Sequence, residues 1–564
     1  MFKKVLLILV VLLGISKFSN AQWTSDTTLN TAVRAASGMS IYTPLLASGN
    51  NGSTYFCYFE NVNGNYEMHM QVLDSAGNKM WAPNGIAVST FPQSSAVYRY
   101  DMAVDNNGDA IVAFQDIRSS GNLNIVVYKV EKNGILPWGS SGIQLVDSTG
   151  TQGLSPKIGI CPNNDVIVAW NASGSGSSKW IAFHKITASG QLAWTSVHRI
   201  KVGTNKYSRP NVIPIVGDEF LIQYVQEVGN FPGVTSTMYL DKFNPNGISS
   251  IANPIKVSDK TIPFFTYPRP VFDGNNGIYL SFQTSNPSNP TINDTYVQHV
   301  TATGYKWSLD GSQAGNSSST HKYPAGPAIH NSNSNETWAL LQVQNSSQSA
   351  SGVYVQKFDS IGNSLLGANA KLVLPIVSDM SVPMDWQMTT NGLIFFYKSG
   401  SFNNEKLRAV KIDFSGNTVW STPIISLAGT SSNKSSVACG KFANNQLVLG
   451  WLDDRTTAGV YAQNISNDGN IGVLSGIKNT NDFQQCSIVE NPSSELRLFL
   501  GSNWDEKWHF DIYSASGSLM LSKSLFSGNN STLVSLSTET FPKGIYFIHA
   551  QTKFYSTTKT WVKN

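Results

Sequence analysis

The sequence predicts an all-β protein built from many small sheets. Only 13% of the 564 residues are charged, while 46 are glycine and 11% are aromatic. This composition is typical of short strands joined by polar turns. Short apolar runs recur along the chain, and a turn recurs with them at roughly 50–60 residues. Apolar residues make up 41% of the chain, which is enough for a packed core.

The recurring turn places a glycine three residues after a polar residue, with a large apolar residue about four positions later. Its clearest copy has Asp413, Gly416 and Trp420 in these places. The glycines of the other copies are Gly77, Gly134, Gly190, Gly247, Gly304, Gly362 and Gly469. Asp, Asn, Ser and Thr can cap such a turn, and glycine allows a positive φ, so we expect a structural role. We expect the tryptophan to pack one repeat against the next.

Each repeat is predicted to hold four short antiparallel strands. A nearly continuous apolar run such as residues 109–116 indicates a strand that is covered on both faces, and residues 352–358 lead into the turn. Four-stranded units at this period predict a β-propeller of about eight blades over residues 22–478. Seven blades with one displaced repeat is the alternative. Trp23 and Ala32-Val33 resemble the segment after a repeat's glycine, so we expect the N-terminal segment to complete the last blade and close the ring.

Residues 1–21 are predicted to be a secretory signal. Lys3-Lys4 precede an apolar run, and Ala21 ends a small-residue cleavage site before Gln22. The run is short for a membrane span, and no longer one follows, which predicts no transmembrane segment in the mature chain. The first 21 residues contain three lysines and no acid, so the net charge of the rest is +1 rather than +4. This charge gives no electrostatic reason to expect nucleic acid as a partner.

From about Asn479 the repeat is lost, which predicts a linker over residues 479–490 and a small Ig-like β-sandwich over residues 491–564. This unit resembles the C-terminal sorting domain of proteins that the type IX secretion system of Bacteroidota exports. The motif residues that carry the resemblance are Asn491, Pro492, Gly517, Pro542, Lys543, Gly544 and Tyr546. The unit departs from the pattern at Glu490 and at Thr560-Trp561.

The resemblance implies passage through the Sec machinery and then export by the type IX secretion machinery. The protein would be secreted to the exterior or attached to the outer surface of the cell.

No signature of a known catalytic centre is found in the sequence. The turn differs from the sialidase Asp-box, where the glycine lies two residues after the Asp. No two-His metalloprotease motif, Gly-x-Ser-x-Gly elbow or phosphate-binding loop occurs. We therefore predict no catalytic, metal-binding or cofactor-binding residues and no cofactor. Asp116-Ile117-Arg118 and Asp453-Asp454-Arg455 are predicted to be loop-stabilising ion pairs. Cys439 with Cys486 is a candidate disulfide, with free thiols as the alternative.

These observations favour a non-enzymatic binding or adhesion protein whose ligand is a glycan or a protein. Exposed aromatic residues in the loops on one face of the ring would supply the contacts. The alternative is a secreted propeller hydrolase that acts on polysaccharide or peptide. Converging carboxylates near the ring axis would favour the hydrolase. A third hypothesis is an adhesion scaffold without a small-molecule site.

Overall fold

The computed structural model describes residues 23–472, apart from residues 94, 97, 119, 120, 175 and 177. In the C-terminal part it describes residues 486–488, 493–500, 507–526, 532–551 and 556–564. The chain divides into two compact units, Met1–Leu474 and Ser475–Asn564, which are described separately below. No helix among the described residues is long and apolar enough to cross a membrane.

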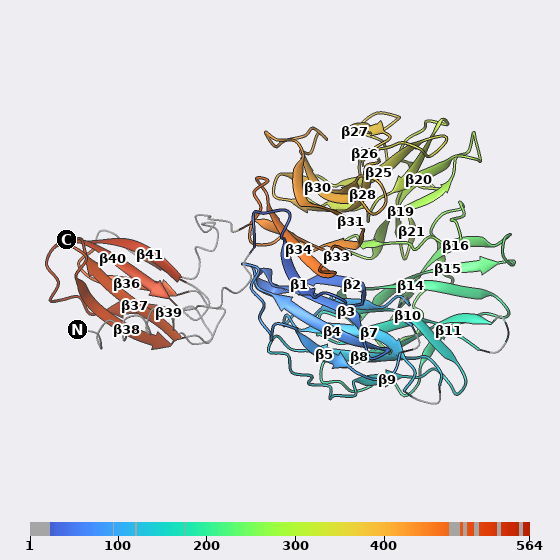
Figure 1. Ribbon diagram of the computed structural model, residues 1–564. Helices are drawn as coiled ribbons and strands as arrows, with labels where there is room; N and C mark the ends of the chain where they lie inside the picture. Colours follow the sequence, from blue (N-terminus) through green and yellow to red (C-terminus); the bar gives the residue numbers. More distant parts are fainter. Residues whose placement is uncertain are drawn as a thin grey trace. The chain divides into compact units, whose positions relative to one another are not determined.

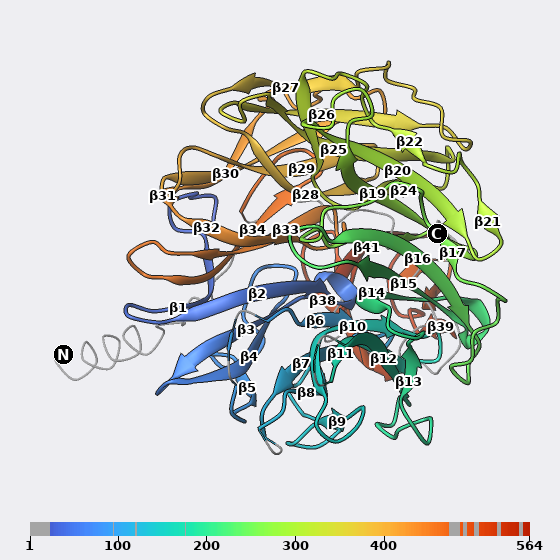
Figure 2. The same ribbon diagram turned by 90° about the vertical axis from the view of Figure 1, so that its right-hand side faces the viewer.

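Eight small antiparallel sheets form the first unit and are arranged around a common axis (Figures 1 and 2). The first blade holds β2 (Ile41–Ser48), β3 (Thr54–Val62), β4 (Asn65–Leu73) and β5 (Ile86–Ser89). The second holds β6 (Asp101–Val104), β7 (Ala110–Asp116), β8 (Asn124–Val130) and β9 (Ile143–Leu145). The third holds β10 (Gln152–Ile160), β11 (Val166–Ser173), β12 (Lys179–Ile186) and β13 (His198–Ile200). The fourth holds β14 (Lys206–Pro214), β15 (Phe220–Val228), β16 (Thr235–Phe243) and β17 (Ile255–Lys256).

The next two blades each contain an additional short strand. The fifth holds β18 (Val271–Phe272), β19 (Gly277–Ser285), β20 (Asn293–Thr301), β21 (Gly304–Tyr305) and β22 (Ser312–Gln313). The sixth holds β23 (Thr320–Pro324), β24 (Ile329–Asn331), β25 (Glu336–Asn345), β26 (Ser351–Phe358) and β27 (Lys371–Val377). The seventh holds β28 (Val382–Thr389), β29 (Gly392–Ser399), β30 (Glu405–Ile412) and β31 (Ile425–Ser432). Two single-turn 3₁₀ segments, η1 (Asn50–Gly52) and η2 (Val216–Asp218), lie between strands.

The eighth blade is completed by the N-terminal segment. Its strands are β32 (Lys434–Cys439), β33 (Gln446–Asp453), β34 (Gly459–Ser466) and β1 (Thr31–Ala35), with β1 antiparallel to β34. The side-chain amide of Asn30 donates to the Leu427 carbonyl at 2.8 Å and to Gln463 Oε1 at 3.0 Å. The eight-bladed propeller and its closure by the N-terminal segment are therefore confirmed.

The recurring turn has the structural role predicted for it. Asp413 Oδ1 accepts the backbone N–H groups of Ser415 and Asn417, both at 2.8 Å, and Gly416 has a φ of 75°. In six blade contacts a tryptophan indole donates to a carbonyl in the turn of the next blade, at 2.8–3.4 Å. These pairs are Trp23 with Ser75, Trp81 with Lys132, Trp138 with Ala188, Trp194 with Pro245, Trp307 with Ser360, and Trp420 with Asn467.

Where the repeat has no tryptophan, another residue makes this contact. Leu366 packs near Gly416, and Lys371 donates to the Ser415 carbonyl at 2.7 Å. At the last junction the residue after the turn, Val473, lies outside the described residues. Trp23, which is 3% exposed, makes the contact there, so the N-terminal segment supplies both a strand and the packing side chain.

We expect Trp23→Ala to lower the free energy of unfolding by about 3–5 kcal/mol, the usual range for removing a buried tryptophan. Urea unfolding of the mature chain measures this loss. Trp138→Ala is the control. Trp138 makes the same kind of hydrogen bond between the second and third blades, away from the ring closure, and is only half-buried. An equal or smaller loss for Trp23→Ala would contradict its role in ring closure.

The second unit is a β-sandwich of two sheets. One has the order β35 (Cys486–Ile488), β36 (Leu496–Leu500), β39 (Thr532–Leu536). The other has the order β38 (Leu519–Phe526), β37 (Lys507–Ser514), β40 (Gly544–Gln551), β41 (Ser556–Lys563). The β-sandwich predicted from the sequence is therefore confirmed. β35 was not expected and lies within the segment predicted to be a linker. Trp561, a departure from the sorting-domain pattern, is fully buried in the core of the sandwich.

Candidate functional site

One face of the ring carries both the turns between the second and third strands of each blade and the connections from one blade to the next. Because the strands of a blade are antiparallel, the turn between the second and third strands lies at the same edge as the connection to the next blade. The first strands of adjacent blades contact one another, for example β6 and β10, which places the first strand of each blade nearest the axis. The longest connection between blades covers residues 257–270 and joins β17 to β18.

An exposed aromatic cluster lies where this connection meets the turn between β15 and β16. The cluster consists of Phe231, Phe264 and Phe265, whose side chains are 71%, 43% and 62% exposed. The ring centroids of Phe231 and Phe264 are 5.1 Å apart, and those of Phe264 and Phe265 are 5.5 Å apart. Grouped apolar rings in contact with water, carried by loops on a rigid scaffold, indicate a recognition site.

Arg209 holds the connection that carries Phe264 and Phe265. The residue is 5% exposed and occupies a bulge of β14, with a φ of 58°. Its guanidinium donates to the carbonyls of Phe264 and Thr266 at 2.8 and 2.7 Å, and to Glu227 at 3.0 Å. Burial lowers the pKa of Arg209, and the Glu227 carboxylate opposes this shift. Since an arginine remains protonated in proteins, the loop is fixed by charged hydrogen bonds before any ligand arrives.

We expect Arg209→Ala to destabilise the propeller by about 3–5 kcal/mol. The largely buried Glu227 carboxylate would lose its closest cation and keep only the exposed Lys179 at 3.6 Å and the Ser208 hydroxyl. Urea unfolding of the mature chain measures the change. Lys441→Ala removes an exposed cation and serves as the control, with an expected change within about 0.5 kcal/mol. Equal stability of the two variants would show that Arg209 does not anchor the loop.

Arg209 belongs to a set of bulges that sequence reasoning did not find. The innermost strands β2, β10, β14 and β32 each change register at a non-glycine residue with positive φ. These residues are Thr43, Ser155, Arg209 and Ser436. Bulges of this kind redirect side chains and are common beside functional sites. The sequence does contain a signal for three of these bulges. A proline follows the bulge residue at equivalent places in three repeats, as Pro44, Pro156 and Pro210.

Charged side chains on the innermost strands, or on the connections that lead into them, interact between blades. Lys157 of the third blade lies 3.3 Å from Asp101 of the second. Arg269 lies 3.5 Å from Asp385, two blades further along the ring. Arg99 of the second blade lies over the ring of Tyr267, 3.6 Å from its centroid, although Tyr267 belongs to the connection that leads into the fifth blade.

Asp385 has the most perturbed environment of these groups. Its side chain is 8% exposed and accepts the backbone N–H groups of Trp386 and Cys439. Burial raises the pKa of Asp385, and Arg269 opposes the shift. Asp101 and Asp385 are each paired with a cation rather than with a second carboxylate. Among the described residues, no group of three or more His, Cys, Asp or Glu could hold a metal ion.

The two predicted Asp–Arg pairs stabilise loops, as expected. Arg118 lies 2.5 Å from the buried carboxylate of Asp116, and Arg455 lies 2.6 Å from that of Asp453. Arg455 also donates to the carbonyl of Thr28 at 2.9 Å and so fixes the N-terminal segment on the last blade. Burial acts to raise the pKa of Asp453, but its hydrogen bonds, above all from Arg455, bring it down to about 2.

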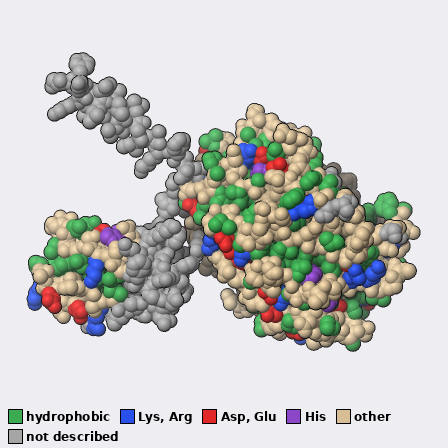
Figure 3. Space-filling view, turned by 90° about the horizontal axis from the view of Figure 1, so that it is seen from below, with side chains coloured by type: hydrophobic (Ala, Val, Ile, Leu, Met, Phe, Trp, Pro, Cys, Tyr) green, Lys and Arg blue, Asp and Glu red, His purple; other side chains and the backbone are tan. Residues whose placement is uncertain are grey.

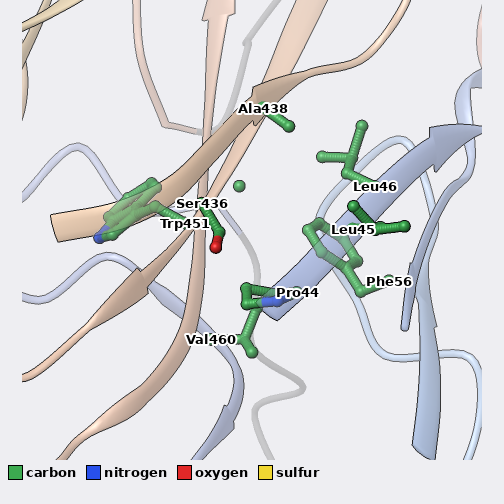
Figure 4. A pocket seen from close by; sticks show the side chains of 9 residues that line it. Pro44, Leu45, Leu46, Phe56, Ser436, Ala438, Trp451 and Val460 are labelled. Carbon is green, nitrogen blue, oxygen red and sulfur yellow. The ribbon is translucent and has the colours of Figure 1, made fainter. Parts of the chain in front are cut away.

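A small apolar crevice lies between the first and last blades (Figure 4). It is lined by Pro44, Leu45, Leu46, Phe56, Ser436, Ala438, Gly450, Trp451 and Val460 and has essentially no room for a water molecule. Small-molecule sites are typically 300–1,000 Å³, so this crevice is a packing gap at the ring closure. On the face of the molecule seen in Figure 3, basic and acidic side chains are interspersed rather than gathered into one patch.

The cysteines that the structure describes are reduced. Cys57, Cys161 and Cys439 are free thiols. The side chain of Cys486, the other half of the candidate disulfide, lies outside the described residues.

The sorting-motif residues that the structure describes lie at turns of the sandwich. Gly517 has a φ of 82° in the turn between β37 and β38. The Tyr546 hydroxyl donates to the Pro542 carbonyl at 2.7 Å, which closes the turn that holds Lys543 and Gly544. Asn491 and Pro492 lie outside the described residues, as do Ala21 and Gln22 at the predicted signal cleavage site.

Comparison with known proteins identifies the C-terminal unit. Residues 491–564 match the family described as the secretion system C-terminal sorting domain. No curated protein matches the chain. The C-terminal unit is therefore a type IX secretion sorting domain, and the protein is exported to the exterior or to the outer surface of the cell. The fold and the sorting domain together place the protein in the class of secreted β-propeller proteins.

Solved structures with a similar fold cover most of the chain at low identity. A polysaccharide lyase of family PL25, an ulvan lyase bound to -[GlcA(1-4)Rha3S]-, has a TM-score of 0.42 at 12% identity over 79% of this chain and 97% of that one. The polysaccharide lyase Uly1 has a TM-score of 0.41 at 8% identity, covering 76% and 90%. The α-L-arabinanase of Penicillium chrysogenum has a TM-score of 0.32 at 10% identity, covering 70% and 97%. These distant similarities concern the propeller fold.

Proposed function

We propose that this secreted propeller binds a polysaccharide on the ring face that carries the aromatic cluster. The observation that carries the proposal is the exposure of Phe231, Phe264 and Phe265, the last two on a connection already fixed by Arg209. Preorganised rings lose little conformational entropy when a ligand covers them. Sugar rings present apolar C–H faces together with hydroxyl groups, which suits exposed aromatic rings with polar groups beside them.

A polysaccharide fits this face better than a protein does. A stable protein interface buries about 800 Å² on each partner and has a well-packed apolar centre. The cluster comprises three rings, and its neighbours on the same loops include Asn230, Lys260 and Thr266. This small apolar area within a polar surround matches a narrow chain of sugar units.

Cleavage of the bound polysaccharide is a second candidate function, and Asp385 favours it. A carboxyl whose pKa is raised by burial can donate a proton to a leaving group. Release of reducing ends from a bound polymer, lost in Asp385→Asn with binding retained, would establish this activity. Binding without release of reducing ends would restrict the protein to a binding role.

A glycan array probed with the mature protein tests the main proposal. We expect binding to polysaccharides that the Phe264→Ser, Phe265→Ser double variant does not recognise. If the wild-type protein recognises no glycan but captures a protein at this face, the polysaccharide proposal is wrong.

For export, we propose that signal peptidase cleaves between Ala21 and Gln22, leaving residues 22–478 as the functional propeller domain. Residues 479–490 would connect it to the sorting domain. The motif read by the secretion machinery would consist of Asn491, Pro492, Gly517, Pro542, Lys543, Gly544 and Tyr546. Mass spectrometry of the secreted protein tests the cleavage site through its first residue.

A further inference from the structure

We infer that the binding site continues from the aromatic cluster to the ring axis, where Arg99 and Arg269 recognise the acidic groups of the polysaccharide. The ligand would therefore be a polymer with carboxylate or sulfate groups. This inference rests on the proposed function and specifies its substrate class.

Arg99 is available to a ligand. Its side chain is exposed, and its guanidinium carbon lies over the ring of Tyr267, 3.6 Å from the centroid; Tyr267 is itself 44% exposed. In the part of the chain that the structure describes, no carboxylate forms an ion pair with Arg99. Stacking uses the face of a guanidinium and leaves its N–H groups directed outward in the guanidinium plane, where an anion binds. The aromatic ring therefore positions Arg99 without neutralising its charge.

Arg269 is only partly neutralised. Its side chain is 53% exposed, and its contact with Asp385 is a single one at 3.5 Å, the long end of the hydrogen-bonding range. Asp385 is also satisfied by two backbone N–H groups, from Trp386 and Cys439. The remaining N–H groups of Arg269 can bind a carboxylate or sulfate in the two-pronged manner typical of arginine.

The structural arginines of this protein differ from Arg99 and Arg269. Arg209 is 5% exposed and donates to two carbonyls of one loop and to Glu227 as well. Arg118 and Arg455 are bound to fully buried carboxylates at 2.5 and 2.6 Å. Arg99 and Arg269 have neither the burial nor the saturated hydrogen bonding, so folding leaves their donors free for a ligand.

The basic and aromatic parts of the site share one segment. Tyr267 and Arg269 follow Phe264 and Phe265 on the same connection between blades, which the Arg209 hydrogen bonds to Phe264 and Thr266 hold in place. Asn211 adds a hydrogen bond to the carbonyl of Pro268 at 3.2 Å. A polymer that covers the phenylalanine rings and extends along this segment therefore reaches the two guanidinium groups.

Affinity measurements with acidic and neutral polymers test the inference. The probes are polygalacturonate and chondroitin sulfate as acidic polymers and laminarin as the neutral one, titrated against the full mature protein at low salt. We expect acidic polymers to bind at least about tenfold more tightly, the effect of one or more charged hydrogen bonds. Arg99→Gln combined with Arg269→Gln should abolish this preference, while Lys441→Gln should retain it. Salt at 0.5 M should also reduce the preference.

The outcomes separate the inference from the function on which it rests. If acidic and neutral polymers bind equally well, or if the double variant keeps its preference, the inference is wrong and polysaccharide binding stands. If no polymer binds, both are overturned. Thermal melting of each variant checks that it is folded, and the single variants provide a second measurement if the double variant does not fold.

Discussion

Deletion of residues 491–564 is expected to abolish secretion and leave the propeller in the periplasm. These residues are the sorting domain that the type IX machinery recognises, and the propeller packs its own cores without them. Immunoblots of the culture medium, the cell surface and the periplasm measure the distribution. A periplasmic protein that retains its ligand binding would show that the deletion removes export alone.

A fusion of residues 475–564 to an unrelated periplasmic reporter is the matched control. Export of the reporter is expected, because the C-terminal unit has its own core around Phe510, Ile548 and Trp561. Normal secretion of the deleted chain would contradict the role of the sorting domain.

Substitution of both Phe264 and Phe265 by Ser is expected to weaken polysaccharide binding by about 100-fold. Covering an aromatic ring contributes on the order of 1.5–3 kcal/mol, and each 1.4 kcal/mol changes affinity tenfold. The stability of the protein should change little, because the side chains of Phe264 and Phe265 are already 43% and 62% exposed. Affinity electrophoresis in gels that contain the polysaccharide measures the change.

Phe402→Ser is the control for this prediction. Phe402 is 76% exposed and lies in the turn between β29 and β30 on the same face of the ring, away from the cluster in sequence. Its substitution should leave binding intact. Equal losses for the two variants would mean that binding depends on general surface hydrophobicity rather than on the cluster.

The propeller could be predicted from the sequence because each repeat carries its own local signals. The turn around Asp413 closes through hydrogen bonds within five residues, and its glycine adopts the φ that only glycine adopts readily. The segment that starts at Trp23 could be recognised as the part that completes the last blade, because its pattern matches the segment after the glycine in the other repeats. The strands of the sorting domain were likewise readable from alternation and turn residues, except for β35, which is only three residues long.

The candidate site could not be predicted because it is assembled from separate blades. Arg209 holds Phe264, 55 residues further on, and Arg99 meets Tyr267 across three blades. Periodicity reports which residues occupy equivalent places in successive blades, and it contains no information about side chains that meet around the axis. Asp385 and Arg269 were therefore not predicted as site residues, although Asp385 lies where β28 changes register.

The most direct test of polysaccharide binding is a crystal structure of the mature protein with a bound oligosaccharide. We predict that sugar rings lie against Phe264 and Phe265, with an acidic group within hydrogen-bonding distance of Arg99 or Arg269. An oligosaccharide bound at the opposite face of the ring, or on the sorting domain, would contradict the account.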